Sequence, residues 1–166
     1  MKRPISGNVL VGDILAGRRD FQRIQLRGFN FYDSPRLVDL EDYLARQDFE
    51  QNPLLFAEAE MEHVYAVGLL LPYSKFQDAK LRNVDFCFAD LRYADFWHAD
   101  LREVDFRSAL TEGACFGGTR AYRVVGVEEL IKDPPKEEYH FRTEDVEIGS
   151  PEYPFVDPKR ARAFFS

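Results

Sequence analysis

The residue types that most often carry chemistry are scattered through this sequence. The three histidines, His63, His98 and His140, have no metal-ligand spacing. Glu58 and Glu62 stand close enough to His63 to approach a cation together, but we interpret these residues as the solvated face of a helix. The sequence contains no nucleophile elbow, phosphate-binding loop or dinucleotide fingerprint. It therefore predicts no enzymatic activity, no metal site and no cofactor.

Composition narrows the class of protein. The chain has 166 residues, of which 45% are apolar, and this suits a single domain with a core. No apolar run is long enough to span a bilayer, and the N-terminus has no stretch typical of a secretory signal. Two cysteines without such a signal predict a cytoplasmic protein with reduced thiols. The net charge of −7 argues against direct nucleic-acid binding.

The elements that position these residues follow from a period of five. Large apolar residues stand at every fifth position, at Leu81, Phe86, Leu91, Phe96, Leu101 and Phe106. A small residue stands two positions before each of them, at Ala79, Val84, Ala89, Ala94, Ala99 and Val104. Five residues fit neither the period of a helix nor that of a flat strand. A chain that turns a corner every five residues buries both positions, and its coils pair their backbones at about 4.8 Å.

The repeated units resemble a known family. The segments 89–93 (ADLRY), 94–98 (ADFWH) and 99–103 (ADLRE) are similar to the A(D/N)LXX units of pentapeptide-repeat proteins. The resemblance is clear from Ser74 to about Phe116, and the frame extends over 69–123. It implies a right-handed quadrilateral β-helix with four pentapeptides in each coil.

Two further segments flank this array on its N-terminal side. Alternating Phe and Leu residues predict one more β-helix coil over 9–33, with an ordinary β-hairpin as the alternative. Between the coils, Ser34-Pro35 and Asn52-Pro53 are typical helix starts, and each precedes apolar residues at helical spacing. We therefore expect a helical hairpin over 34–68, inserted into the β-helix or covering one of its open ends.

The C-terminal segment 124–166 departs from the repeat. It combines prolines with aromatic residues at Tyr139, Phe141, Tyr153, Phe155, Phe164 and Phe165. Residues 124–131 suit a strand or a short helix, and the remainder suits an extended tail that packs on the domain. Many members of the resembled family dimerise through a C-terminal helix, whereas this tail is rich in proline. Self-association is therefore left open.

The frame also assigns roles to polar residues. An aspartate precedes each central apolar residue in five successive units, where its short side chain can accept a backbone hydrogen bond at a corner: Asp85, Asp90, Asp95, Asp100 and Asp105. With four units in each coil, Cys87 and Cys115 fall on opposite faces, which argues against a disulfide between them.

Two functions fit such a protein. The best-known members of the resembled family are acidic rods that mimic DNA, bind DNA gyrase and protect it from quinolones. Residues 74–123, however, contain eight basic and eight acidic residues. Sixteen units at most would make four coils, about 19 Å at one strand spacing per coil, whereas one turn of DNA is about 34 Å long. We therefore favour a non-enzymatic module that binds a protein partner through its β-helix faces, and keep the gyrase-binding mimic as the alternative.

The candidate contact surface consists of aromatic residues at outward positions. Phe88, Tyr93, Trp97 and His98 follow central residues of the repeat, where other units carry polar residues or glycine. Either a protein partner binds them, or the tail or the helical insert covers them. Arg82 and Arg102 stack one coil apart on another face, where they could dock an anionic partner or the acidic insert.

Overall fold

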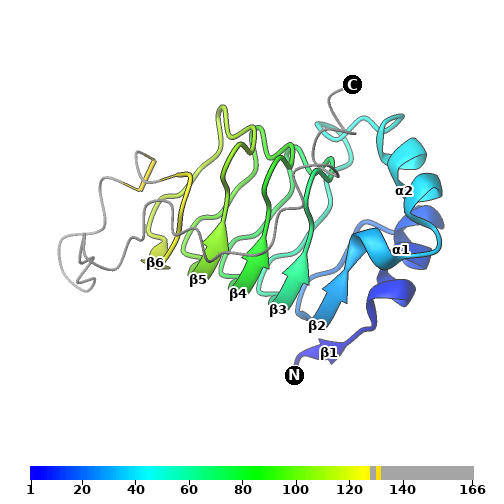
Figure 1. Ribbon diagram of the computed structural model, residues 1–166, viewed down its shortest axis with the longest axis horizontal. Coiled ribbons are helices and arrows are strands. Elements are labelled where there is room, and N and C mark those ends of the chain that lie inside the picture. Colours follow the sequence, from blue (N-terminus) through cyan, green and yellow to red (C-terminus); the bar gives the residue numbers. More distant parts are fainter. Residues whose placement is uncertain (128–129, 132–166) are drawn as a thin grey trace.

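A single parallel sheet organises the chain (Figure 1). The computed structural model describes residues 1–127 and 130–131. Six strands follow one another in the sheet in sequence order. They are β1 (Arg3–Pro4), β2 (Ile24–Asn30), β3 (Glu60–Tyr65), β4 (Lys80–Asp85), β5 (Asp100–Asp105) and β6 (Arg120–Tyr122).

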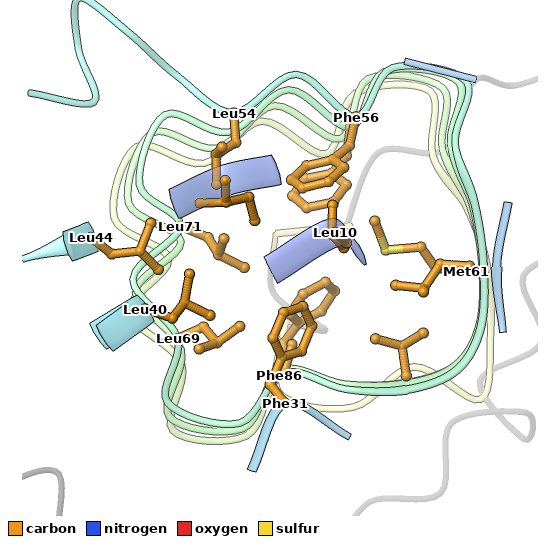
Figure 2. A pocket seen from close by; sticks show the side chains of 15 residues that line it. Leu10, Phe31, Leu40, Leu44, Leu54, Phe56, Met61, Leu69, Leu71 and Phe86 are labelled. Atoms are coloured by element: carbon orange, nitrogen blue, oxygen red, sulfur yellow. The ribbon is translucent and has the colours of Figure 1, made fainter. Parts of the chain in front are cut away.

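The strands are parts of coils that repeat every 20 residues. Glu60 pairs with Lys80, Lys80 with Asp100, and Asp100 with Arg120. A coil of 20 residues holds four units of five, and isolated parallel bridges join the other sides of successive coils, as between Leu70 and Asp90. Seen along its axis, the stack has a four-sided outline (Figure 2). The period of five therefore produces a β-helix, as the sequence predicted.

Apolar side chains fill the inside of the stack. All eight large apolar residues that the five-residue period assigns to the interior of the array are buried: Phe76, Leu81, Phe86, Leu91, Phe96, Leu101, Phe106 and Phe116. Phe96 lies between Phe76 and Phe116, with ring centroids 4.9 Å from each and nearly parallel planes. Offset aromatic stacking of this kind stabilises the core beyond its burial from water.

The prediction of a second helix in the insert is wrong. Residues 54–68 form another coil of the β-helix, with β3 in its middle and Leu54, Met61 and Val64 buried. The apolar spacing in this segment fits both periods, since these three residues also occupy the inward positions of the five-residue frame. The coil that follows offers an unpaired strand edge, and parallel pairing with that edge decides between the two periods.

The prediction of a β-helix coil is also wrong for the N-terminal part of residues 9–33. Residues Gly7–Leu15 form helix α1, while β2 and Phe21 complete a partial coil. Ser6 caps α1, because its side chain accepts a hydrogen bond from the Val9 backbone N–H. The sequence does contain a signal for this helix: Ser6 is a favourable N-cap, and the apolar residues Leu10, Val11 and Ile14 follow it at helical spacing.

Helix α2 (Leu37–Leu44) lies in the segment that the sequence assigned to the insert, although it starts at Leu37 and not directly after Ser34. Together with α1 it covers the N-terminal end of the β-helix (Figure 1). Leu10 of α1 lies in the middle of the four-sided outline, and Leu40 and Leu44 of α2 enter from one side (Figure 2). A cavity of about 20 Å³ with wholly apolar lining remains between the helices and the coils. This space is far too small for a ligand and belongs to the core.

The array ends near its last described residues. Val125 forms a parallel bridge with Asp105, and Val124, Val127 and Ile131 are buried. Residues 128–129 and the tail predicted over 132–166, including all of its aromatic residues, lie outside the described residues. Among the described residues, no helix is long and apolar enough to cross a membrane.

Candidate interaction surface

The corners of the coils set the outward direction of the candidate residues. Every fifth residue from Glu58 to Arg123 has a positive φ: these are Glu58, His63, Gly68, Tyr73, Asp78, Asn83, Phe88, Tyr93, His98, Glu103, Ser108, Gly113, Gly118 and Arg123. Each stands two positions after a central residue, where the chain turns to the next side. Phe88, Tyr93 and His98 therefore occupy three successive corners of one coil.

Tyr93 belongs to a stack of two tyrosines at one corner. Its ring lies on that of Tyr73 in the preceding coil, with centroids 4.9 Å apart and an interplanar angle of 20°. On the following coil, Gly113 leaves room for the ring, since a Cβ added there would lie 2.4 Å from Tyr93 Cδ1. Tyr93 is 47% exposed. Its orientation is thus fixed while much of its surface faces solvent.

Trp97 and His98 form a second aromatic pair at the next corner. Their ring centroids are 4.8 Å apart, and Trp97 is 48% exposed. The Trp97 ring covers Gly117 of the following coil and the His98 ring covers Gly118, because an added Cβ would lie 2.3 Å and 2.1 Å from the respective rings. Glycine in the following coil accommodates all three side chains, which lean along the axis of the β-helix.

The remaining candidates do not join this surface. Phe88 is half-buried at the preceding corner, diagonally across the coil from His98. Arg82 and Arg102 are neighbours in the register of β4 and β5, on the side that carries the strands. Arg102 forms an ion pair with Asp100, at 3.1 Å. The six candidate residues are therefore distributed over several sides of the β-helix and form no single site.

A groove lies beside the tyrosine stack, and the sequence did not reveal it. The loop after α2 approaches the corner occupied by Tyr73 and Tyr93, leaving a groove of about 450 Å³. Its walls are formed by Gln47, Asp48, Phe49, Glu50, Pro72, Tyr73, Arg92 and Tyr93. The helical spacing of the insert gives no indication of where its final loop lies, so only the folded chain brings these residues together.

Four of the five aspartates have the role that their position predicted. Asp85, Asp90, Asp95 and Asp105 each accept a hydrogen bond from the backbone N–H two residues later. In three units an arginine two residues after the aspartate also binds its carboxylate, giving the pairs Asp90–Arg92, Asp100–Arg102 and Asp105–Arg107.

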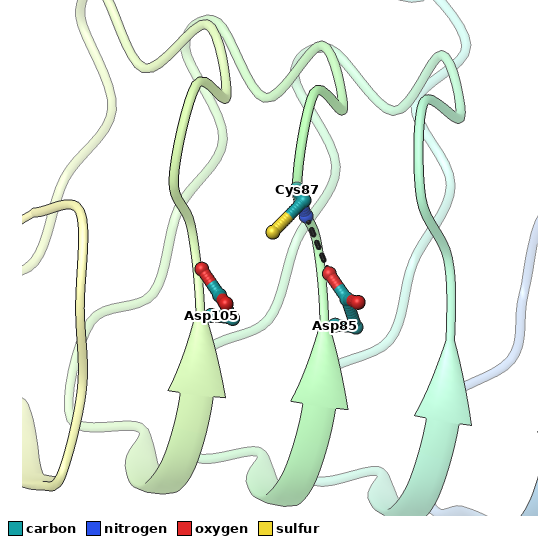
Figure 3. Close-up of side chains that lie close together, drawn as sticks. All are labelled: Asp85, Cys87 and Asp105. Carbon is teal, nitrogen blue, oxygen red and sulfur yellow. Dashed lines mark hydrogen bonds between the residues drawn. The ribbon is translucent and has the colours of Figure 1, made fainter. Parts of the chain in front are cut away.

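Asp85, Cys87 and Asp105 form a buried polar cluster (Figure 3). One ligand-type atom from each lies within 4.8 Å of the others. The Cys87 N–H donates to Asp85 Oδ1 at 2.8 Å, and Arg107 holds the Asp105 carboxylate at 2.5 Å. Asp85 Oδ2 is buried and receives no hydrogen bond from the described residues. This cluster could be found in the sequence only by aligning residues 20 positions apart.

Electrostatics favour the protonated forms of Asp85 and Cys87. Burial raises the pKa of the Asp85 carboxyl to about 6, and the nearby Asp105 carboxylate adds to this rise. Burial, with both carboxylates, also raises the pKa of the Cys87 thiol. A metal would need the thiolate and would compete with Arg107 for Asp105. The arrangement is therefore suited to a protonated thiol between two carboxyl groups.

The other candidates for metal binding lie apart or have other partners. Glu58 forms an ion pair with Arg23, and Glu62 forms one with Arg27. His63 stands on β3, within hydrogen-bonding distance of Asn83, so the helix face predicted for these residues is wrong. His140 lies outside the described residues. Cys87 and Cys115 are both free thiols.

Comparison with known proteins identifies the repeat. The family model for pentapeptide repeats matches residues 74–107 in eight copies. No curated protein sequence matches the chain at a significant level.

Two solved structures show the extent of the structural likeness. QnrB1, a plasmid-mediated fluoroquinolone resistance protein, is similar over 63% of this chain, with 14% identity and a TM-score of 0.29. HetL, a pentapeptide repeat protein of the cyanobacterium Nostoc that is involved in regulation of heterocyst differentiation, is similar over 72%, with 18% identity and a TM-score of 0.30. The chain spans 56% and 51% of their respective lengths. Residues 74–107 therefore match the pentapeptide-repeat family, and the structure arranges these repeats in coils of 20 residues.

Proposed function

We propose that this chain is a non-enzymatic protein-interaction module whose contact surface is centred on Tyr93 and Trp97. The observation that carries the proposal is that two large aromatic side chains are about half exposed while the following coil holds each in place. An aromatic residue with a fixed orientation loses little conformational entropy on binding, and Trp and Tyr are enriched at the centres of interfaces. The free thiols agree with a cytoplasmic location.

The charges of the array do not favour extending this proposal to DNA mimicry. Along the column of paired residues on the side that carries the strands, Glu60, Lys80, Asp100 and Arg120 alternate in sign from coil to coil. A mimic of DNA would need one sign of charge along its length.

Affinity capture from the native host tests the proposed module. The double variant Tyr93→Ala/Trp97→Ala should lose a partner that the wild-type chain retains. Leu110→Ala/Tyr122→Ala removes two other exposed apolar side chains and should retain that partner. Equal binding by all three proteins would refute the surface. A gyrase supercoiling assay with and without a quinolone tests the alternative, and we expect no effect of the chain in either condition.

A further inference from the structure

The groove beside Tyr73 and Tyr93 is anionic. Asp48 and Glu50 are exposed on its wall, and neither forms an ion pair with any described residue. The cation of the opposite wall, Arg92, is neutralised by Asp90, whose carboxylate it holds at 2.6 Å. The groove thus presents two carboxylates without a bound cation. A phosphate or another anion would be repelled there.

The two carboxylates line the same groove as the tyrosine stack. The Tyr73 pKa is raised, first by burial and then by the charges of Glu50, Tyr93 and Asp48, while the charge of Arg92 lowers it. The carboxylates are therefore close enough to the Tyr73 hydroxyl for their fields to reach it. Tyr73 and Tyr93, which stack on each other, both line the same groove. Aromatic rings attract cations, and the attraction is larger where a neighbouring carboxylate supplies the counter-charge.

The walls of the groove are held in place. Phe49 is buried and anchors the loop that carries Asp48 and Glu50. The Asp48 carboxylate accepts a hydrogen bond from the Gln51 backbone N–H, at 3.2 Å. The tyrosines stand on corners of the β-helix, of which Tyr73 is followed by a buried serine and Tyr93 by a buried alanine. A ligand that enters this groove finds its charges and rings already arranged.

We propose that the groove between the loop Gln47–Glu50 and the tyrosines Tyr73 and Tyr93 binds an arginine side chain from an exposed segment of a protein partner. The planar guanidinium group can lie against the tyrosine rings and donate hydrogen bonds to Asp48 and Glu50, which the compact ammonium of lysine does less well. The inference rests on the proposed interaction function and adds to it the chemistry of the partner.

The direct test uses the full chain and a probe of known chemistry. The nine-residue peptide GSGSRSGSG is titrated into the ¹⁵N-labelled protein, followed by NMR, and compared with the same peptide carrying citrulline in place of arginine. Citrulline has almost the same shape but no charge. We expect the arginine peptide to shift the backbone amides of Asp48, Glu50, Tyr73 and Tyr93. The citrulline peptide should bind more weakly by about tenfold or more, as the loss of charge-assisted hydrogen bonds predicts.

Variants identify the groove as the place of binding. Asp48→Asn/Glu50→Gln should weaken binding of the arginine peptide by about tenfold or more. Asp33→Asn/Asp42→Asn makes the same change of net charge at exposed residues away from the groove, and should change binding by less than about twofold. Equal binding of the two peptides, equal losses in the two variants, or the absence of shifts at these four amides would each overturn the proposal.

The failure of this proposal can be told apart from failure of the interaction module. If Trp97→Ala abolishes capture of a partner while Asp48→Asn/Glu50→Gln leaves it unchanged, the module stands and the arginine groove is wrong. If the peptide shifts the groove amides and Asp48→Asn/Glu50→Gln weakens capture but Trp97→Ala leaves capture unchanged, the groove stands and the surface around Trp97 is wrong.

Discussion

Asp85 and Asp105 are paired residues of β4 and β5, but a different residue type stands two positions after each of them. Two positions after Asp105, Arg107 neutralises its carboxylate, whereas two positions after Asp85 stands Cys87. Asp85 is only 2% exposed and lies beside a second carboxylate. The repeat thus buries a carboxyl group here without the cation that compensates it in neighbouring units.

Replacing Asp85 with asparagine should stabilise the protein above pH 6. The folded pKa of about 6 lies above the ordinary value of 3.8, so folding favours the protonated carboxyl. Its contribution to stability is fully present below about pH 4 and is lost as the pH rises through 6. The asparagine side chain cannot ionise and keeps an acceptor for the Cys87 N–H. We expect the free energy of unfolding at pH 8 to rise by about 1–3 kcal/mol and to change little at pH 4.

Urea unfolding at the two pH values measures this difference. Asp95→Asn is the matched control, since Asp95 has the same position in its unit and accepts the Trp97 N–H at 3.0 Å, but its side chain is partly exposed. If the control gains as much stability at pH 8, burial of the Asp85 charge is not the cause.

Truncation of Phe96 should be among the most costly single changes in the core. Phe96 is fully buried, stacks on Phe76 and Phe116, and meets Phe86 and Phe106 edge-on. Phe96→Ala should lower the free energy of unfolding by about 3–5 kcal/mol in chemical denaturation. Trp97→Ala, one residue later and half exposed, should cost much less. A loss below about 1 kcal/mol for Phe96→Ala would contradict the stacked core.

Adding a methyl group at Gly117 should move the Trp97 ring. The new Cβ would lie 2.3 Å from Trp97 Cζ3, and φ at Gly117 does not require glycine. Trp97 is the single tryptophan of the chain, so its emission reports the change directly. We expect Gly117→Ala to shift the emission maximum to longer wavelength as the ring moves into solvent.

The matched control for this change lies in helix α1. An added Cβ at Gly12 meets nothing within 4 Å. Gly12→Ala should leave the emission unchanged and increase stability by about 0.5–1 kcal/mol, because alanine is favoured over glycine in a helix. An unchanged spectrum in Gly117→Ala would show that Trp97 does not lie on this glycine.

The left-handed backbone at the corners predicts that valine destabilises the protein more than glycine does at Ser108. This residue is exposed, and its φ of 58° is unfavourable for a β-branched side chain. Ser108→Val should cost about 1–2 kcal/mol and Ser108→Gly should not destabilise the protein. Glu112→Val, at an exposed position without positive φ, is the control for added β-branching. Thermal unfolding of the three variants tests the order, and equal effects of both valines would contradict it.

The sequence was sufficient to predict the fold in the middle of the molecule. In residues 74–107 the five-residue period has no competitor, and the inward positions, the corner aspartates and the exposure of Tyr93 and Trp97 all follow from it. It was insufficient at the N-terminal end, where two periods share residues. Leu54, Met61 and Val64 suit both a helix and the repeat, and only pairing with the next coil selects the strand.

The polar sites show a second limit of prediction from the sequence. Asp85 and Asp105 are distant in sequence, and their approach depends on a coil length that no single unit specifies. The groove is harder still, since Glu50 reaches Tyr73 through a loop whose path depends on the packing of Phe49. Local patterns indicate which residues point outward, but they do not indicate which outward residues become neighbours.

The short strand β1 has a consequence for assembly. It covers the outer edge of β2 with two residues, of which Pro4 has no N–H to offer, and α1 continues over the same end (Figure 1). Head-to-tail polymerisation of a solenoid requires both of its ends to accept strands from another molecule. Because β1 and α1 cover this end, we expect that it does not accept a strand from another molecule, so that subunits do not add to one another indefinitely through it.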